Sequence, residues 1–155
     1  MQFTTAAITA ILSASAVFAA PASVATTTAA PAATTTPAAI PDWTFQDVRR
    51  ICDEPDDTCT WFFQLNQNTG SFIAGCTFVV KGSPASQGST TTPAKCSRFS
   101  VSAGWSGQFG PGNGFTTLAV HDDSNGQMAW PAYTDAELAD GKTVTPDKSF
   151  PVTQM

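Results

Sequence analysis

The sequence contains few basic residues and only one histidine. Its 155 residues include 7 lysine or arginine and 12 aspartate or glutamate residues, so the net charge is −5. Proteins bind nucleic acids and anionic membrane surfaces through clusters of basic residues. The small number of basic residues therefore argues against both as partners of this chain. The length suits one ordinary domain and is too short for two.

Charged residues and cysteines are both absent from the first 41 residues. Residues 6–20 are apolar or small and include Val17-Phe18-Ala19, a pattern typical of a secretory signal peptide cleaved after Ala19. The stretch departs from that pattern in having no lysine or arginine before it. It is shorter than the ~20 apolar residues of a membrane-spanning helix. We therefore expect residues 1–19 to be a signal peptide and the product to be secreted and extracellular.

Residues 20–41 consist almost entirely of alanine, threonine and proline. Without aromatic side chains, this stretch has too little apolar surface to offset the entropy cost of ordering its backbone. We expect a disordered linker. Threonine and proline together in a secreted chain favour an O-glycosylated stalk, and a bare linker or a pro-segment is the alternative.

Residues 42–155 form the predicted domain, and their apolar residues alternate as they do in β-strands. In 99–106, for example, every second residue is apolar and the others are serine or glycine. Further strands are predicted over 43–45, 59–66, 72–81, 115–121, 127–130 and 143–145.

Two turn sequences and one helix signal complete the predicted fold. Asn68-Thr69-Gly70 and Asn125-Gly126 would join neighbouring strands as antiparallel hairpins. Thr134 and Glu137 form a capping box that predicts one short helix ending at Gly141. Because a single open sheet leaves apolar faces in water, we expect an all-β fold, either a small antiparallel β-barrel or a sandwich.

The four cysteines predict two disulfides, because this is the usual state of cysteine in small secreted domains. Three pairings are conceivable. The turn at 68–70 would place Cys76 opposite residues 61–63, which disfavours a bond between Cys76 and Cys59. Of the remaining pairings, we prefer the two local bonds, Cys52–Cys59 and Cys76–Cys96. A zinc site is disfavoured, because the spacing of Cys52 and Cys59 is not typical of zinc ligands.

No pattern in the sequence predicts a catalytic residue, a metal site or a cofactor. His121 could serve a catalytic triad, but the segment around Ser106 does not match Gly-x-Ser-x-Gly, because Gln108 occupies the last position. The acidic run 53–57 lacks the ligand spacing of a known calcium loop, which favours a solvated group of charges. The sequence therefore does not predict an enzyme.

The most distinctive segment is 104–115, where five glycines interleave with Trp105, Phe109 and Phe115. An exposed Phe109 would offer an aromatic platform for sugars or partner proteins. The alternative is a glycine-rich connection whose aromatic rings close one end of the domain. The candidate recognition patch consists of Trp105, Ser106, Gln108, Phe109 and Asn113.

Several motifs of the domain together resemble one known family. They are Cys52…Cys59-Thr-Trp61, Cys76-Thr-Phe-Val-Val80, Cys96, the glycine-rich stretch 104–118, and the segments 131–142 and 146–150. The family comprises small secreted ascomycete proteins that act as elicitors of the plant hypersensitive response. The resemblance covers essentially all of residues 42–155. It implies a compact β-barrel-like fold, export to the plant apoplast and no assigned enzymatic activity or catalytic residues.

This resemblance leads to the first functional hypothesis. The chain is expected to be an apoplastic fungal protein that a plant cell-surface receptor perceives, with defence or cell death as the output. The second hypothesis is a cell-wall or carbohydrate-binding module that uses Trp105 and Phe109. A hydrolase with an unrecognised site is the third.

Overall fold

The structure, a computed structural model, describes residues 39–70 and 72–155. The predicted signal peptide and most of the predicted linker lie outside the described residues. The described part contains ten strands: β1 (Trp43–Cys52), β2 (Thr58–Asn66), β3 (Ile73–Lys81), β4 (Ala94–Cys96), β5 (Phe99–Ser106), β6 (Phe115–Asp122), β7 (Gln127–Ala129), β8 (Ala132–Thr134), β9 (Lys148–Phe150) and β10 (Val152–Gln154). Its helical elements are the short 3₁₀ turns η1 (Ala85–Gln87) and η2 (Ala139–Gly141).

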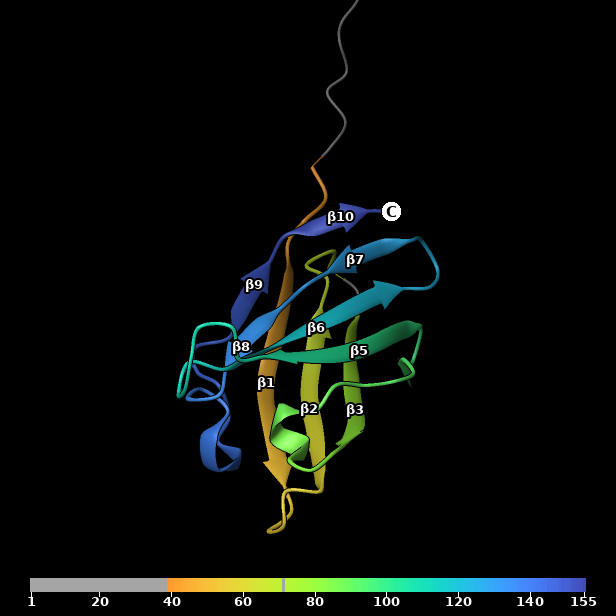
Figure 1. Cartoon of the computed structure of the whole chain (residues 1–155). Helices are drawn as coiled ribbons and strands as arrows, with labels where there is room; N and C mark the ends of the chain where they lie inside the picture. Colours follow the sequence, from red (N-terminus) through yellow and green to blue (C-terminus); the bar gives the residue numbers. More distant parts are fainter. Residues whose placement is uncertain (1–38, 71) are drawn as a thin grey trace, which may run out of the picture. The chain divides into compact units, whose positions relative to one another are not determined.

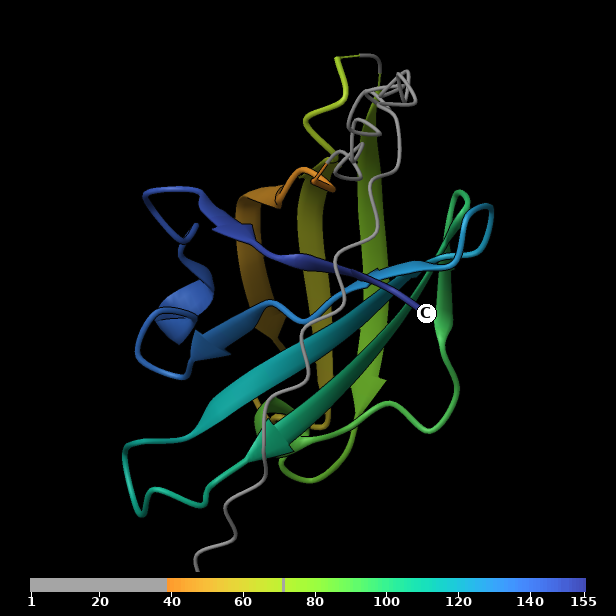
Figure 2. The same cartoon turned by 90° about the horizontal axis from the view of Figure 1, so that it is seen from above.

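The strands form two antiparallel sheets that pack face to face. One sheet has the order β3-β2-β1-β9, and the other has the order β10-β7-β6-β5-β4 with β8 beside β6. Their strands cross at a steep angle (Figures 1 and 2). Both sheets are open at their edges. Of the two predicted architectures, the described domain therefore has the sandwich, and the barrel-like fold that the family resemblance implied is not closed.

The alternating pattern places one face of each strand in the core between the sheets. In β2, for example, Trp61 and Phe63 are buried, whereas Gln64 is exposed. The Trp61 ring stacks on Phe78 of β3, with centroids 5.9 Å apart. The Trp43 ring of β1 meets Phe99 of β5 edge-on at 5.6 Å. Tyr133 of β8 meets Phe150 of β9 in the same way at 5.9 Å, so aromatic contacts join the two sheets.

The C-terminal segment connects the sheets along one side of the sandwich. β9 pairs with β1 of the first sheet, and β10 pairs with β7 of the second. Pro151 stands between β9 and β10. Because proline has no backbone N–H, it suits the point where the chain leaves one ladder and enters the next.

Both predicted disulfides are confirmed. The turn after β2 sets a register that pairs Phe63 with Cys76, as the sequence predicted. Cys76 is bonded to Cys96 of β4, which ties the two sheets together on the side opposite β9 and β10. Cys52 is bonded to Cys59, its partner in the β1–β2 ladder.

Two local predictions differ from the structure. The short helix takes the form of turns followed by η2, although the capping contacts form: Thr134 N donates to Glu137 Oε2 at 2.9 Å. Asp140 has φ +59°, a left-handed conformation that ends the helical path. The strand predicted over 143–145 is wrong, because Val144 is instead buried as part of a loop and donates its N–H to Val48 O at 2.7 Å. Among the described residues, no helix is long and apolar enough to cross a membrane.

Candidate functional site

The glycine-rich connection between β5 and β6 is folded into two successive turns. Gly110 N donates to Gly107 O at 3.0 Å, and Asn113 N donates to Gly110 O at 3.1 Å. Gly110 and Gly112 have φ values of +88° and +77°, which glycine adopts without steric cost. The turns leave Phe109 with 67% of its surface exposed, the largest fraction of any aromatic residue in the described part of the chain.

The Trp105 ring packs against the backbone of this connection. Its indole Nε1 donates to Asp135 Oδ2 at 2.9 Å. A Cβ atom at Gly107 would lie 2.5 Å from the indole ring, and one at Gly114 would lie 2.8 Å from it. The ring is therefore covered by backbone on two sides. Within the candidate recognition patch, Gln108, Phe109 and Asn113 are exposed, whereas Trp105 and Ser106 are half-buried.

We expect Gly114→Ala to lower the free energy of unfolding by about 1–3 kcal/mol, because the new methyl group overlaps the Asp135 carboxylate and the Trp105 ring that it binds. Gly104→Ala is the matched control: nothing lies within 4 Å of the methyl group that this substitution adds, so its stability should be close to that of the parent. Urea titrations of both variants measure the difference. Equal stabilities would contradict the close packing of Gly114 against Trp105.

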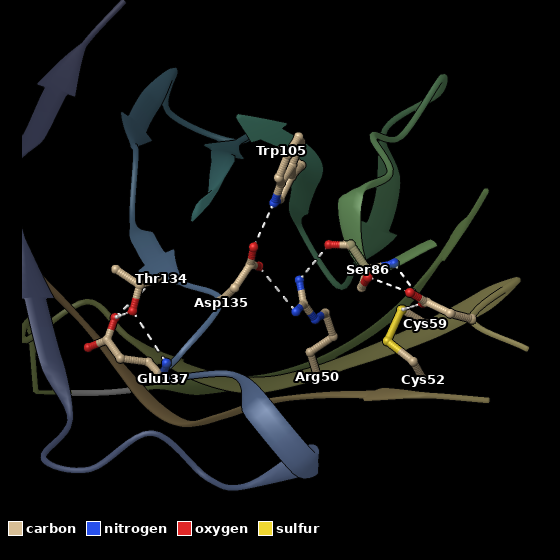
Figure 3. A network of polar contacts seen from close by, with 9 residues as sticks. Arg50, Cys52, Cys59, Ser86, Trp105, Thr134, Asp135 and Glu137 are labelled. Atoms are coloured by element: carbon tan, nitrogen blue, oxygen red, sulfur yellow. Dashed lines mark hydrogen bonds and ion pairs between the residues drawn. A yellow bond between two sulfur atoms is a disulfide. The ribbon is translucent and has the colours of Figure 1, made fainter. Parts of the chain in front are cut away.

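Asp135 links Trp105 to a buried arginine (Figure 3). The Arg50 Nη2 donates to Asp135 Oδ1 at 3.2 Å, and its Nη1 donates to Ser86 O at 2.7 Å. The Arg50 side chain is only 7% exposed, and its guanidinium lies 5.7 Å from the centre of the Trp61 ring. A buried arginine requires such partners, because an unpaired charge inside a protein is costly.

The same network continues to the first disulfide. Ser86 N donates to Asp56 Oδ1 at 2.8 Å, and the Ser86 hydroxyl also bonds to that carboxylate. Asp56 lies in the acidic loop that Cys52–Cys59 closes. The network therefore links Trp105, which packs against the glycine-rich connection, to three segments that are distant in sequence. These are the turn after β8, η1 and the acidic loop.

An open groove of about 510 Å³ lies beside the glycine-rich connection. The side chains that matter to its chemistry are Phe109, Asn113, Phe115, Tyr133, Glu137 and Lys148. The rings of the two phenylalanines form one side, with centroids 5.6 Å apart and planes tilted by 30°.

The charged residues that line the groove, Glu137 and Lys148, form an ion pair. Lys148 Nζ donates to Glu137 Oε1, and Glu137 Oε2 accepts bonds from the backbone and hydroxyl of Thr134. Burial acts to raise the pKa of Glu137, but the Lys148 and Thr134 hydrogen bonds outweigh it and hold that pKa below its usual range. The carboxylate is therefore ionised at neutral pH, and Lys148 balances its charge.

Tyr133 lies beneath this ion pair and is almost fully buried. Lys148 Nζ lies 5.2 Å from the centre of its ring. Burial and the neighbouring carboxylates of Glu137 and Asp147 raise the pKa of Tyr133, so its phenol stays neutral. Its hydroxyl has no hydrogen-bond partner among the described residues.

Among the described residues, the imidazole of His121 pairs with a carboxylate and receives no serine hydroxyl. His121 Nδ1 lies 2.8 Å from Asp123 Oδ1, and Ser100 is the cross-strand partner of His121. The Ser100 hydroxyl donates to Asp123 Oδ2 at 2.8 Å, not to the imidazole. The hydrogen bonds from Lys95, His121 and Ser100 lower the pKa of Asp123. The sequence did not indicate this cluster, because only the β5–β6 register brings Ser100 beside His121.

The acidic loop uses its carboxylates for its own structure. Asp53 Oδ1 accepts the N–H groups of Asp57 at 2.8 Å and Thr58 at 2.9 Å. Cys52 and Cys59 lie within 4.8 Å of Asp56, in a geometry that could hold a metal ion. Their sulfur atoms are consumed in the disulfide, however, and thus offer no thiolate ligand.

A buried carboxylate, which no sequence pattern indicated, joins the two sheets. Asp122 of β6 is fully buried and lies 3.1 Å from Arg98 Nε. It accepts bonds from Gln67 Nε2 at 3.0 Å and Ser124 N at 3.0 Å. Burial acts to raise the pKa of Asp122, but these bonds and the Arg98 charge hold it below its ordinary value. This cluster is structural and lies outside the groove.

Comparison with known proteins identifies relatives along the whole domain. The family model described as Effector TSP1 matches residues 44–155. A protein named Effector TSP1, from Hypocrea virens strain Gv29-8, is 37% identical over 150 residues, which cover 97% of this chain and 96% of that protein. The matched region includes the glycine-rich connection, both disulfides and the groove.

Proposed function

Because the chain belongs to the Effector TSP1 family, we propose that it is a secreted fungal effector that a plant cell-surface receptor perceives in the apoplast. The hypersensitive response would be the output of this perception. An uncharged apolar leader and two disulfides support an extracellular role. The mechanism that we propose is recognition of the folded surface, which needs no catalytic residue and no cofactor.

The exposed glycine-rich connection is the surface that we assign to this recognition. Phe109 presents 67% of its surface to solvent, with Gln108 and Asn113 exposed beside it. Aromatic side chains dominate the energetics of many protein interfaces, because they bury a large area at little cost in conformational entropy. The Trp105–Asp135–Arg50 network holds the platform in place, which lowers the cost of binding.

Leaf infiltration of the protein secreted into culture medium tests this proposal, with ion leakage as the readout. We expect Phe109→Ala to raise the protein concentration needed for a given leakage by about tenfold. Phe72→Ala is the matched control, because Phe72 is also exposed, at 51%, but lies outside the patch. His121→Ala should also keep full activity. A fully active Phe109→Ala variant would exclude this patch, and an inactive parent protein would exclude elicitation.

A further inference from the structure

The groove beside the glycine-rich connection has the properties of a ligand site. Its volume of about 510 Å³ lies within the ~300–1,000 Å³ typical of small-molecule sites. It combines apolar side chains with a few polar groups, which is the usual composition of such sites. Most of its lining residues lie outside the patch assigned to receptor recognition.

The aromatic side of the groove is suited to a ligand with a flat, weakly polar face. The Phe109 ring is exposed to solvent, although its burial would be favourable. Its plane is tilted by only 30° from that of Phe115. The face of an aromatic ring is electronegative and attracts C–H groups that carry a partial positive charge. Sugar rings present such C–H groups on their faces.

The charged groups of the groove indicate that the ligand is neutral. Glu137 and Lys148 are the charged residues among those described in the lining, and they neutralise each other. The whole chain carries −5, which repels polyanions. A ligand with a net charge would therefore find no unpaired partner in the groove.

Hydrogen-bonding capacity remains for a hydroxyl-rich ligand. An ammonium group has three N–H donors, and Glu137 takes one donor of Lys148. The Asn113 amide makes only long contacts of 3.4 Å, to Phe109 O and Pro111 O. Lys148 and Asn113 can therefore both bond to a ligand that lies against the phenylalanine rings.

We propose that this groove binds a neutral β-1,4-linked oligosaccharide of a cell wall. A β-1,4-linked chain is a flat ribbon that offers its apolar faces for stacking and its hydroxyl groups at its edges. One sugar ring would stack on Phe109, while Lys148 and Asn113 bind hydroxyl groups. Chitin of the fungal wall and cellulose of the plant wall share this chemistry. The inference goes beyond recognition by a receptor, because it requires no plant protein.

Titration of the ¹⁵N-labelled full secreted protein, followed by NMR, tests the inference. The probes are chitohexaose and cellohexaose, with β-1,3-linked laminarihexaose and anionic trigalacturonate as comparisons. We expect saturable shifts with at least one β-1,4-linked probe, centred on residues 107–115 and Lys148. The two hexasaccharides distinguish the fungal from the plant source. Absence of shifts with both at millimolar concentration overturns the inference, and so does binding of trigalacturonate alone.

Groove variants locate the binding. Phe109→Ala is expected to weaken binding by about tenfold, and Lys148→Met by about threefold. Phe72→Ala and Lys142→Met are the matched controls, since Phe72 and Lys142 lie outside the groove, and both should bind like the parent. Phe109→Trp, which keeps an exposed ring, should retain binding.

Unchanged affinity in both groove variants overturns the assignment. A leaf response without any oligosaccharide binding overturns this inference and leaves receptor recognition standing. Oligosaccharide binding without a leaf response supports this inference and overturns recognition by a receptor.

Discussion

Asp135→Asn is expected to lower the free energy of unfolding by about 3 kcal/mol. The substitution keeps the shape of the side chain but removes the charge that balances Arg50, which is only 7% exposed. An arginine left without its counterion in that environment pays most of its desolvation cost. The amide can also accept only with its single oxygen, so either Trp105 or Arg50 loses its acceptor.

Asp140→Asn is the control for this experiment. Asp140 lies in the same segment, pairs with Lys142 at the surface and has a side chain that is 77% exposed. Its φ of +59° is one that asparagine tolerates. We expect this variant to stay within about 0.5 kcal/mol of the parent. Urea unfolding, followed by tryptophan fluorescence, measures both variants. Equal losses would show that the Arg50–Asp135 pair contributes no more than a surface pair.

Removal of the second disulfide is expected to have a comparable effect. In the chain-entropy model, a bond between residues 20 apart in sequence stabilises the fold by about 3.3 kcal/mol. Cys76–Cys96 also joins the edge strands of two different sheets. The doubly substituted Cys76→Ala/Cys96→Ala protein should therefore unfold at much lower denaturant concentration.

The first disulfide provides the comparison. Cys52 and Cys59 are only 7 residues apart and already face each other in the β1–β2 ladder, so the same model gives about 2.5 kcal/mol. Guanidinium titrations of the two double variants, side by side, measure both losses. A larger loss of unfolding free energy in Cys52→Ala/Cys59→Ala would contradict the expected order. It would indicate that the acidic loop and its contact with Ser86 stabilise the domain more than the Cys76–Cys96 bond between the sheets does.

Four of the five longer strands, β2, β3, β5 and β6, could be predicted because their burial pattern is local, whereas β1 was predicted only over its first three residues. β5 coincides with the predicted range 99–106, since a strand buried on one face alternates apolar and polar residues. The resemblance to fungal effectors is likewise confirmed by the family match over 44–155. The preferred pairing of the four cysteines is confirmed. The predicted turn had disfavoured one of the three alternatives, because the side-chain period of two makes register and disulfide partners interdependent.

The short strands could not be predicted in the same way. β4, β8, β9 and β10 each have three residues, too few to show a period. β7 is equally short, but it was predicted because the Asn125-Gly126 turn precedes it. The segment 143–145 has the composition of a strand but pairs with no ladder, so Val144 fills the core from a loop. In each case the pairing partner decides the structure, and that partner is distant in sequence.

The sequence by itself determined the all-β class, the presence of two disulfides and the glycine-rich aromatic connection, because these depend on local alternation, cysteine content and glycine content. The packing of the two sheets decided for a sandwich over a barrel, and the fold of the connection left Phe109 exposed. Only the tertiary structure decided what supports that connection. Arg50 and Asp135 are 85 residues apart, and nothing local to either indicates the other. Packing the two sheets across one core brings them together, because a buried charge is tolerated only where the fold supplies its partner.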